Sequence, residues 1–182
     1  MRTLCVGLLL ASSAFAAAPP ALAFTLTWEQ GEHSRDTSGS RSTFTLENGR
    51  LARESRAWGR QAMFGGSKEP KKKTLKLNAA QLEELRALLA ATEGLEDVRV
   101  PTMQDVGPVL EASLTVPAAK GAARTLVLEA YPTNDHVRGP KAEILDPEPS
   151  DTKAAVAPGA KTYAAMKQLY LKLLGLFPLE PF

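Results

Sequence analysis

Apolar and polar residues alternate in several short segments of this chain, which is the period of a half-buried β-strand. The segment FTLTWEQ places Phe24, Leu26 and Trp28 on one face, and VLEASLTV and RTLVLEAY alternate in the same way. A strand that is apolar on one face only must bury that face against another layer of the protein. The alternation therefore predicts a sheet with one covered face.

Two turn signals indicate that neighbouring strands run antiparallel. Asn48-Gly49 lies between two strand-like segments, and both central positions of a tight hairpin turn require residues that accept positive φ. Pro117–Ala123 separates the other two runs and predicts a second hairpin. With the opening strand and a short strand at TLKL, the pattern predicts about six strands.

Two segments carry the apolar stripe of an amphipathic helix. The first begins after Asn78, which forms an approximate capping box with Gln81, and Gly94 is placed to end it. The second starts at Gly159 or Thr162 and is ended by Pro178. The apolar positions are Leu82, Leu85, Leu88, Leu89, Tyr163, Met166, Leu169, Tyr170, Leu173 and Leu174. The order of strands and helices predicts an α+β domain, an antiparallel sheet with two helices packed on one face.

Residues 1–23 have the parts of a secretory signal peptide. Arg2 supplies the positive end, Leu4–Phe15 the apolar core and Ala21-Leu22-Ala23 the cleavage site. The apolar core is shorter than the roughly 20 residues that a transmembrane helix needs. We therefore expect cleavage after Ala23, export to the periplasm or the extracellular space, and no transmembrane segment afterwards. The remaining residues, 24–182, are expected to form a single domain without cysteine, because Cys5 lies in the signal.

A long aperiodic segment, residues 132–159, separates the second hairpin from the final helix. Tyr131–Gly159 contains five prolines. Loops of this length in compact domains are usually functional or disordered. Two interpretations stay open, a stiff recognition loop and a tolerated insertion. On the first interpretation, the candidate partner-binding residues of this loop are Asp135, His136, Arg138 and Lys141.

Basic residues concentrate between Arg50 and Lys76, where nine of them stand against two acidic residues. Because residues two apart share a face of a strand, Arg53 and Arg56 are predicted to point to opposite faces. One interpretation is a solvated sheet edge on which charge opposes edge-to-edge pairing. The other is a surface for an anionic partner, such as an acidic protein, a glycan or lipid headgroups. The candidate residues here are Arg60, Lys71, Lys72 and Lys73.

The sequence offers no convergent catalytic or metal-binding set. His33 and His136 lack the spacing of metal ligands, and a zinc site needs three or four of them. There is no G-x-S-x-G elbow, and Gly65-Gly66-Ser67-Lys68 lacks the spacing of a phosphate loop. A stacking series of aromatic residues for nucleic acid is also missing. We therefore expect a monomeric, non-enzymatic domain without cofactor, metal or nucleic-acid partner.

The order of the patterned segments resembles the emfourin-type protease inhibitors. The resemblance rests on the opening strand FTLTWEQG, the helix LNAAQLEELRALLAATEGL, the hairpin LTVPAAKGAARTLVLEA and the closing helix KTYAAMKQLYLKLLGLF. Such inhibitors are small α+β domains that block a secreted metalloprotease, so the resemblance implies that fold and an inhibitory activity. The hairpin at Asn48-Gly49, the signal peptide and the long loop depart from the family pattern, and no inhibitory residue is transferred.

The leading hypothesis is an exported, non-enzymatic binding domain. Its partner would be an unidentified protein or an anionic component of the cell envelope. We expect contact through the long loop, with the segments Gly31–Arg41 and Gly65–Lys73 as further candidates. Two alternatives are an inhibitor of a secreted hydrolase and a hydrolase that uses paired carboxylates.

Overall fold

The computed structural model describes residues 21–32, 38–59, 69–100, 108–118, 121–133, 136–141, 143–146 and 157–178. Most of the predicted signal peptide, residues 1–20, lies outside these described residues. So do His33, Arg60 and Asp135 and the segment Gly65–Lys68. The expectations for them therefore stay predictions.

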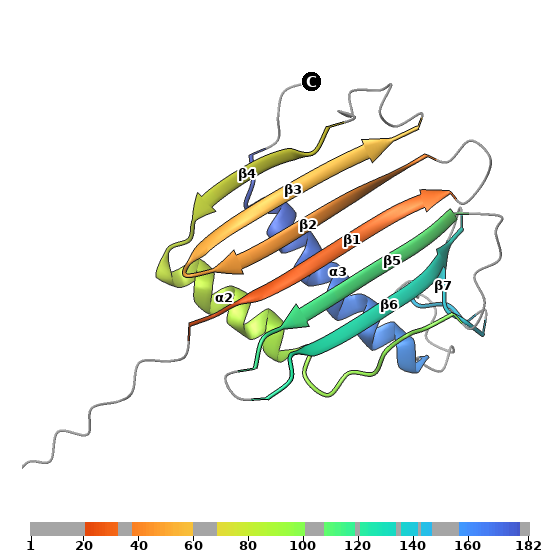
Figure 1. The fold of residues 1–182 in the computed structure, drawn as a ribbon. Helices are drawn as coiled ribbons and strands as arrows, with labels where there is room; N and C mark the ends of the chain where they lie inside the picture. The colour runs from red at the N-terminus through yellow and green to blue at the C-terminus, as the bar shows by residue number, and fades with distance from the viewer. Residues whose placement is uncertain are drawn as a thin grey trace, which may run out of the picture.

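The described strands form one antiparallel sheet (Figure 1). They are β1 (Phe24–Glu32), β2 (Gly39–Glu47), β3 (Arg50–Trp58), β4 (Lys71–Lys76), β5 (Pro108–Val116), β6 (Arg124–Pro132) and β7 (Val137–Arg138). The seven strands lie in the order β4-β3-β2-β1-β5-β6-β7. The first described strand, β1, is thus the central strand of the sheet.

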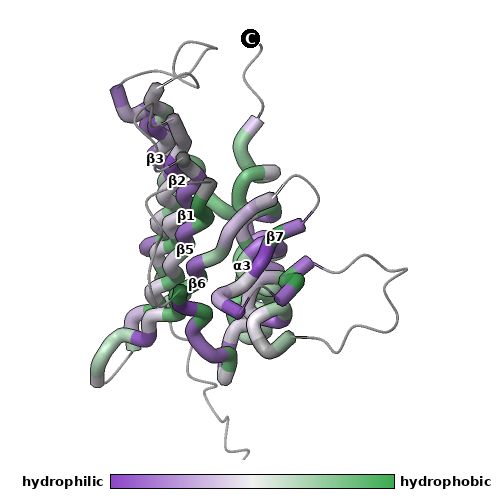
Figure 2. Tube along the Cα trace, turned by 90° about the vertical axis from the view of Figure 1, so that its right-hand side faces the viewer, coloured by the Kyte–Doolittle hydropathy of each residue, from purple (hydrophilic) through white to green (hydrophobic). Residues whose placement is uncertain are grey.

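Two described helices, α2 (Ala79–Ala90) and α3 (Pro158–Gly175), cover one face of the sheet. In the side view of Figure 2, α3 lies on one side of the sheet while the opposite sheet face carries no described helix. This arrangement confirms the predicted α+β class. It also gives the sheet a helix-side face, which the helices cover, and an open face on the opposite side.

The structure adds one strand to the predicted set of about six. β7 lies inside the segment predicted to be a loop, and its backbone pairs Tyr131 with Arg138 and Pro132 with Val137. Two residues are too few to show alternation, so the sequence pattern could not reveal this strand. Arg138 also bridges to Ile144, which means that part of the long loop has its own structure.

The hairpin and helix signals are confirmed with small shifts at the ends. Asn48 and Gly49 have φ of 50° and 72°, as a tight hairpin turn requires. Asn78 accepts a hydrogen bond from the N–H of Gln81, whose side chain accepts one from the N–H of Asn78, a complete capping box. α2 ends at Ala90, so Gly94, with φ of 72°, lies in the turn beyond the cap and does not form it.

The core lies between the helix-side face and the two helices. Phe24, Leu26 and Trp28 of β1 are buried there, and all the predicted stripe positions of α3 except the half-buried Tyr170 and Leu174 are buried as well. In α2, Leu85 and Leu89 are buried. Phe177, just beyond α3, is also buried.

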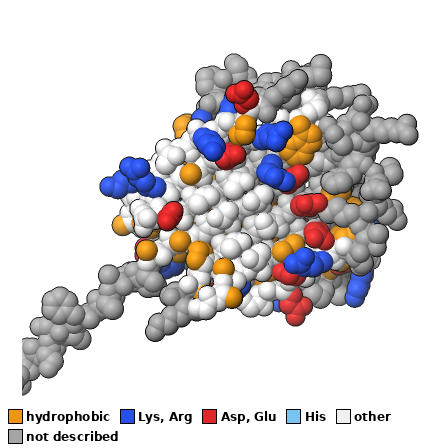
Figure 3. Space-filling model, viewed as in Figure 1, with side chains coloured by type: hydrophobic (Ala, Val, Ile, Leu, Met, Phe, Trp, Pro, Cys, Tyr) orange, Lys and Arg blue, Asp and Glu red, His pale blue; other side chains and the backbone are white. Residues whose placement is uncertain are grey.

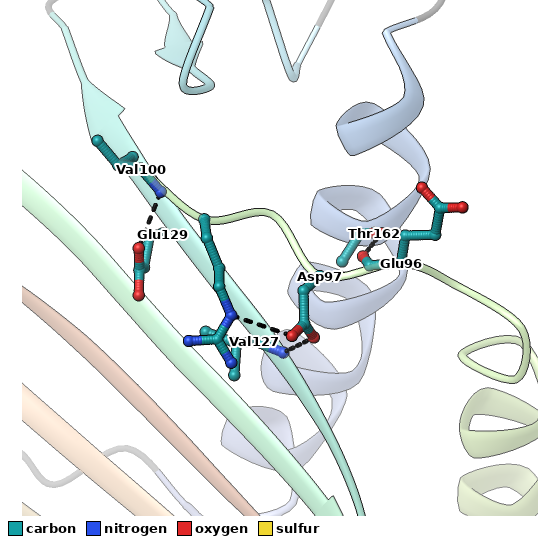
Figure 4. Close-up of polar contacts among 7 residues, drawn as sticks. Glu96, Asp97, Val100, Val127, Glu129 and Thr162 are labelled. Carbon is teal, nitrogen blue, oxygen red and sulfur yellow. Dashed lines mark hydrogen bonds and ion pairs between the residues drawn. The ribbon is translucent and has the colours of Figure 1, made fainter. Parts of the chain in front are cut away.

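A segment between α2 and β5 runs along the outer edge of β6 (Figure 4). Val98 pairs with Leu128 in parallel, and the carboxylate of Asp97 accepts the N–H of Val127 at 2.9 Å. The carboxylate of Glu129 accepts the N–H of Val100 at 2.8 Å. Thr162 of α3 donates to the backbone O of Glu96 at 2.9 Å. This part of the sheet edge is therefore covered by the chain itself.

Candidate functional site

The two groups of predicted partner-binding residues lie at opposite edges of the sheet. Lys71, Lys72 and Lys73 form the first half of β4, which is one edge strand. His136, Arg138 and Lys141 lie in and around β7, which is the other edge strand. The full width of the sheet separates the groups, so they cannot line one compact site. Each group has to be judged by its own surroundings.

The described part of the long loop is attached to the core. Leu145 is 1% exposed and its N–H donates to the backbone O of Val137 at 2.8 Å. The carboxylate of Asp146 accepts the N–H of Val137 at 2.6 Å and lies 3.9 Å from Nδ1 of His136. Val137 and Leu145 therefore anchor this segment to the core. His136 is held in place by these contacts, while Lys141 stands exposed.

The lysines of β4 divide between the two faces of the sheet. Lys72 lies on the open face, where its Nζ is 3.1 Å from a carboxylate oxygen of Glu54. Lys73 pairs with Arg53 and Lys71 pairs with Ser55, which places both on the helix-side face. The basic run is therefore not one patch, as predicted from the strand period. The three lysines belong to an edge strand. Two of them, Lys71 and Lys73, place positive charge on the face that packs against the core.

Among the basic residues of the helix-side face, Arg53 has the most unusual surroundings. Its guanidinium carbon lies 5.8 Å from the centre of the Phe44 ring and 6.0 Å from the centre of the Phe177 ring. Its Nε is buried and has no hydrogen-bond partner among the described residues. A buried donor without an acceptor costs free energy, so such an atom in a folded protein calls for an explanation.

The half-buried Tyr170 and the buried Ser42 form a polar pair beside Arg53. Ser42 is 7% exposed and shares a hydrogen bond with the hydroxyl of Tyr170. Burial raises the pKa of Tyr170, and the opposing effects of Ser42 and of the positive charge of Arg53 are smaller. Tyr170 therefore stays protonated at neutral pH. We call Arg53, Lys71, Lys73, Ser42 and Tyr170 the basic corner.

Sequence reasoning found part of the basic corner. The lysines were candidates, and the strand period placed Arg53 on one face. Ser42 and Tyr170 were not singled out, because Tyr170 fits the apolar stripe of α3. A signal for Ser42 was present: it shares a strand face with Phe44 and Leu46, so it is a hydroxyl on an otherwise apolar face.

Other kinds of site find less support in the described residues. No group of three or more His, Cys, Asp or Glu side chains there could hold a metal ion. The buried polar residues of this part are Ser42, Thr92 and Thr162, so it contains no buried pair of carboxylates. Within the same residues, no helix is long and apolar enough to cross a membrane.

Comparison with known proteins gives no relative from which a role could be transferred: no protein-family model, curated protein or solved structure matches this chain.

Proposed function

We propose that this protein is an exported, non-enzymatic binding domain that recognises an anionic group at the basic corner. The observation that carries the proposal is the buried Nε of Arg53, which lacks an acceptor among the described residues. A carboxylate, sulfate or phosphate oxygen would supply one. Arg is well suited to this task because its planar guanidinium matches the geometry of such anions.

The surroundings of Arg53 support binding in two ways. The rings of Phe44 and Phe177 hold the guanidinium in one place, so little side-chain entropy is lost when a ligand binds. Lys73, directly across from Arg53 on the neighbouring strand, adds a second positive charge on the same face.

The chemistry of the basic corner favours binding over catalysis. Arg53 is permanently charged, and the raised pKa of Tyr170 keeps its hydroxyl protonated at neutral pH. These groups can donate hydrogen bonds and neutralise charge, but neither can accept a proton in a reaction. A general base would have to come from elsewhere than Arg53 or Tyr170.

Titration calorimetry with polygalacturonate, with inorganic phosphate and with phosphatidylglycerol vesicles tests the proposal on the intact protein. Arg53→Met should weaken binding of the recognised probe by at least about tenfold, the loss of one charge-assisted contact. Arg56→Met is the matched control, because Arg56 lies on the open face of the same strand and should change binding by less than about twofold. Equal effects of both variants would contradict a site at Arg53.

A second candidate function, inhibition of a secreted hydrolase, is favoured by the anchored loop. Leu145 and Asp146 fix the backbone around β7, and a fixed recognition loop loses less entropy on binding than a mobile one. We expect an inhibitor of this kind to act on the host's own secreted proteases at micromolar concentration. The triple variant His136→Ala, Arg138→Ala, Lys141→Ala should abolish inhibition while Arg53→Met preserves it. Inhibition that survives the triple variant would remove the loop from this role.

A further inference from the structure

The open face of the sheet is mostly free of charge at its centre (Figure 3). One row of paired residues crosses six strands there: Thr74, Ala52, Thr45, Thr25, Thr115 and Thr125. Hydroxyl groups of this face are already paired with one another, Thr115 with Thr125 at 3.2 Å and Thr27 with Thr43 at 3.5 Å. Covering these groups with another protein surface would therefore leave few of them without a partner.

A second row on the same face is strongly charged and ordered by sign. Its members, in order from β3 to β6, are Arg56, Arg41, Glu29, Glu111 and Glu129. Arg41 donates to a carboxylate oxygen of Glu29 at 2.6 Å. The three glutamates occupy directly opposite positions on neighbouring strands. The row is positive on one side of β1 and negative on the other.

This charge pattern is complementary to itself. A two-fold axis along β1 exchanges β2 with β5 and β3 with β6, because β1 is the central strand. The rotation places Arg41 opposite Glu111 of the second copy and Arg56 opposite Glu129 of the second copy. Glu29 meets its own copy near the axis, where the hydrogen-bonded Arg41 side chains neutralise the contact. A two-fold axis across the strands would instead place each charged residue over the far end of its own strand, without such pairing.

We propose that two copies of this chain associate through their open faces about this axis. A third pair of charges fits the same axis. Lys72 on β4 and Val127 on β6 lie in one row across the sheet, and Asp97 lies just beyond Val127 at the edge of β6. The rotation brings Lys72 opposite Asp97 of the second copy. The uncharged row through Thr25 then meets its own copy. Thr27, in the next row, which ends in Glu54 and Lys72, also lies close to the axis.

The size of the open face suits such a contact. Strands β3 to β6 span about 24 Å across and about 30 Å along their length, which gives about 700 Å². A typical stable interface buries about 800 Å² on each partner. Packed sheets lie about 10 Å apart with their strands about 30° from parallel, so the axis would bisect that angle. This proposal differs from the monomer expected from the sequence, and the tests below decide between them.

The first test exchanges the charges of Arg41 and Glu111 and measures the dimer dissociation constant by sedimentation equilibrium. The protein is the full chain, expressed and processed in its host. Arg41→Glu alone and Glu111→Arg alone should each weaken the dimer by at least about tenfold. The double variant should restore it, because the introduced arginine would also rebuild the ion pair with Glu29, its neighbour on β1. Arg86→Glu on α2 is the control and should leave dimerisation unchanged. A monomer at all concentrations, or a double variant as weak as the singles, would overturn the proposal.

Cross-linking gives a second test that does not depend on stability. In a Cys5→Ser background, Thr27→Cys lies near the axis and should form a symmetric dimer with a short bis-maleimide. Thr74→Cys on β4 should not, because two such residues would lie about 29 Å apart across the sheet. Equal cross-linking of both variants would exclude this axis. Capture of a glycan by the open face, with no dimer, would likewise overturn the proposal.

Discussion

The ring of Trp28 stacks on the ring of Tyr170, with their centroids 4.6 Å apart and their planes 10° from parallel. Trp28 belongs to the central strand and Tyr170 to the long C-terminal helix, so this contact joins the two layers of the domain. Phe44 adds an edge contact, with its centroid 5.9 Å from that of Tyr170. The same tyrosine reaches Ser42 with its hydroxyl and so connects the core to the basic corner.

Tyr170→Phe should retain the stacking and lose the hydrogen bond to Ser42. We expect a loss of about 1 kcal/mol in the free energy of unfolding at neutral pH. The raised pKa makes the folded protein hold the tyrosine proton to higher pH than the unfolded chain does. The stability advantage of the wild type should therefore shrink as pH rises above 10.0, the ordinary value. Urea unfolding of both proteins between neutral and alkaline pH measures this, and a constant difference would contradict the raised pKa.

Arg53→Met should not destabilise the protein, although it should weaken binding. The contact of the guanidinium with the two aromatic rings contributes about 0.5–1 kcal/mol. The buried Nε without an acceptor costs about 1–3 kcal/mol, and methionine removes that cost while filling similar space. We expect the free energy of unfolding to stay equal or to rise by about 1 kcal/mol. A clear fall in the urea midpoint would show that Arg53 serves stability.

Leu145→Ala should detach the described part of the long loop. Removing a fully buried leucine costs about 2–5 kcal/mol of unfolding free energy, depending on how far the cavity collapses. The half-buried neighbour Ile144 provides the control, and Ile144→Ala should cost clearly less. Chemical unfolding gives the free energies, and limited proteolysis shows whether cleavage near residues 136–146 becomes faster. Similar effects of the two changes would mean that Leu145 is not the anchor.

Gly39→Ala should disturb the sheet where Trp58 lies across two glycines. A Cβ at Gly39 would lie 2.6 Å from the backbone O of Gln30 and closer still to the Trp58 ring. At Gly31 the same ring would be 3.3 Å away. We expect Gly39→Ala to cost about 1–3 kcal/mol and Gly31→Ala clearly less. In a double-mutant cycle, Trp58→Leu should recover part of the loss at Gly39, and strict additivity would argue against the ring contact.

Local signals predicted most of the fold because the interactions that cause them are local. Asn48-Gly49 sets the hairpin turn through its own backbone angles, and Asn78 caps its own helix. β7 and the path of Val98 beside β6 were not predicted. Both depend on pairing with β6, and neither segment is long enough to show a period. Such pairing is decided by the tertiary structure.

The candidate site was predicted only in part, because some of its features follow from local sequence and others from tertiary packing. The period of β3 separates Arg53 from Arg56, which any alternating strand would do. The environment of Arg53 depends on Phe177 and Tyr170, which follow it by more than a hundred positions in the chain. Their approach results from the packing of α3 across the sheet, which no local pattern encodes. The sequence could therefore identify Arg53 as a charged residue on one face of the strand, but it could not predict the buried surroundings of Arg53.

The central position of β1 determines the order in which the chain can fold. Thr25 faces Thr45 on one side and Thr115 on the other, so this strand stays half paired until β5 has been synthesised. Contacts between distant parts of a chain form slowly, because a long loop must close first. A ribosome would thus release the beginning of this domain well before the chain could complete its sheet. The nascent chain would remain a suitable client for chaperones until most of its length had emerged.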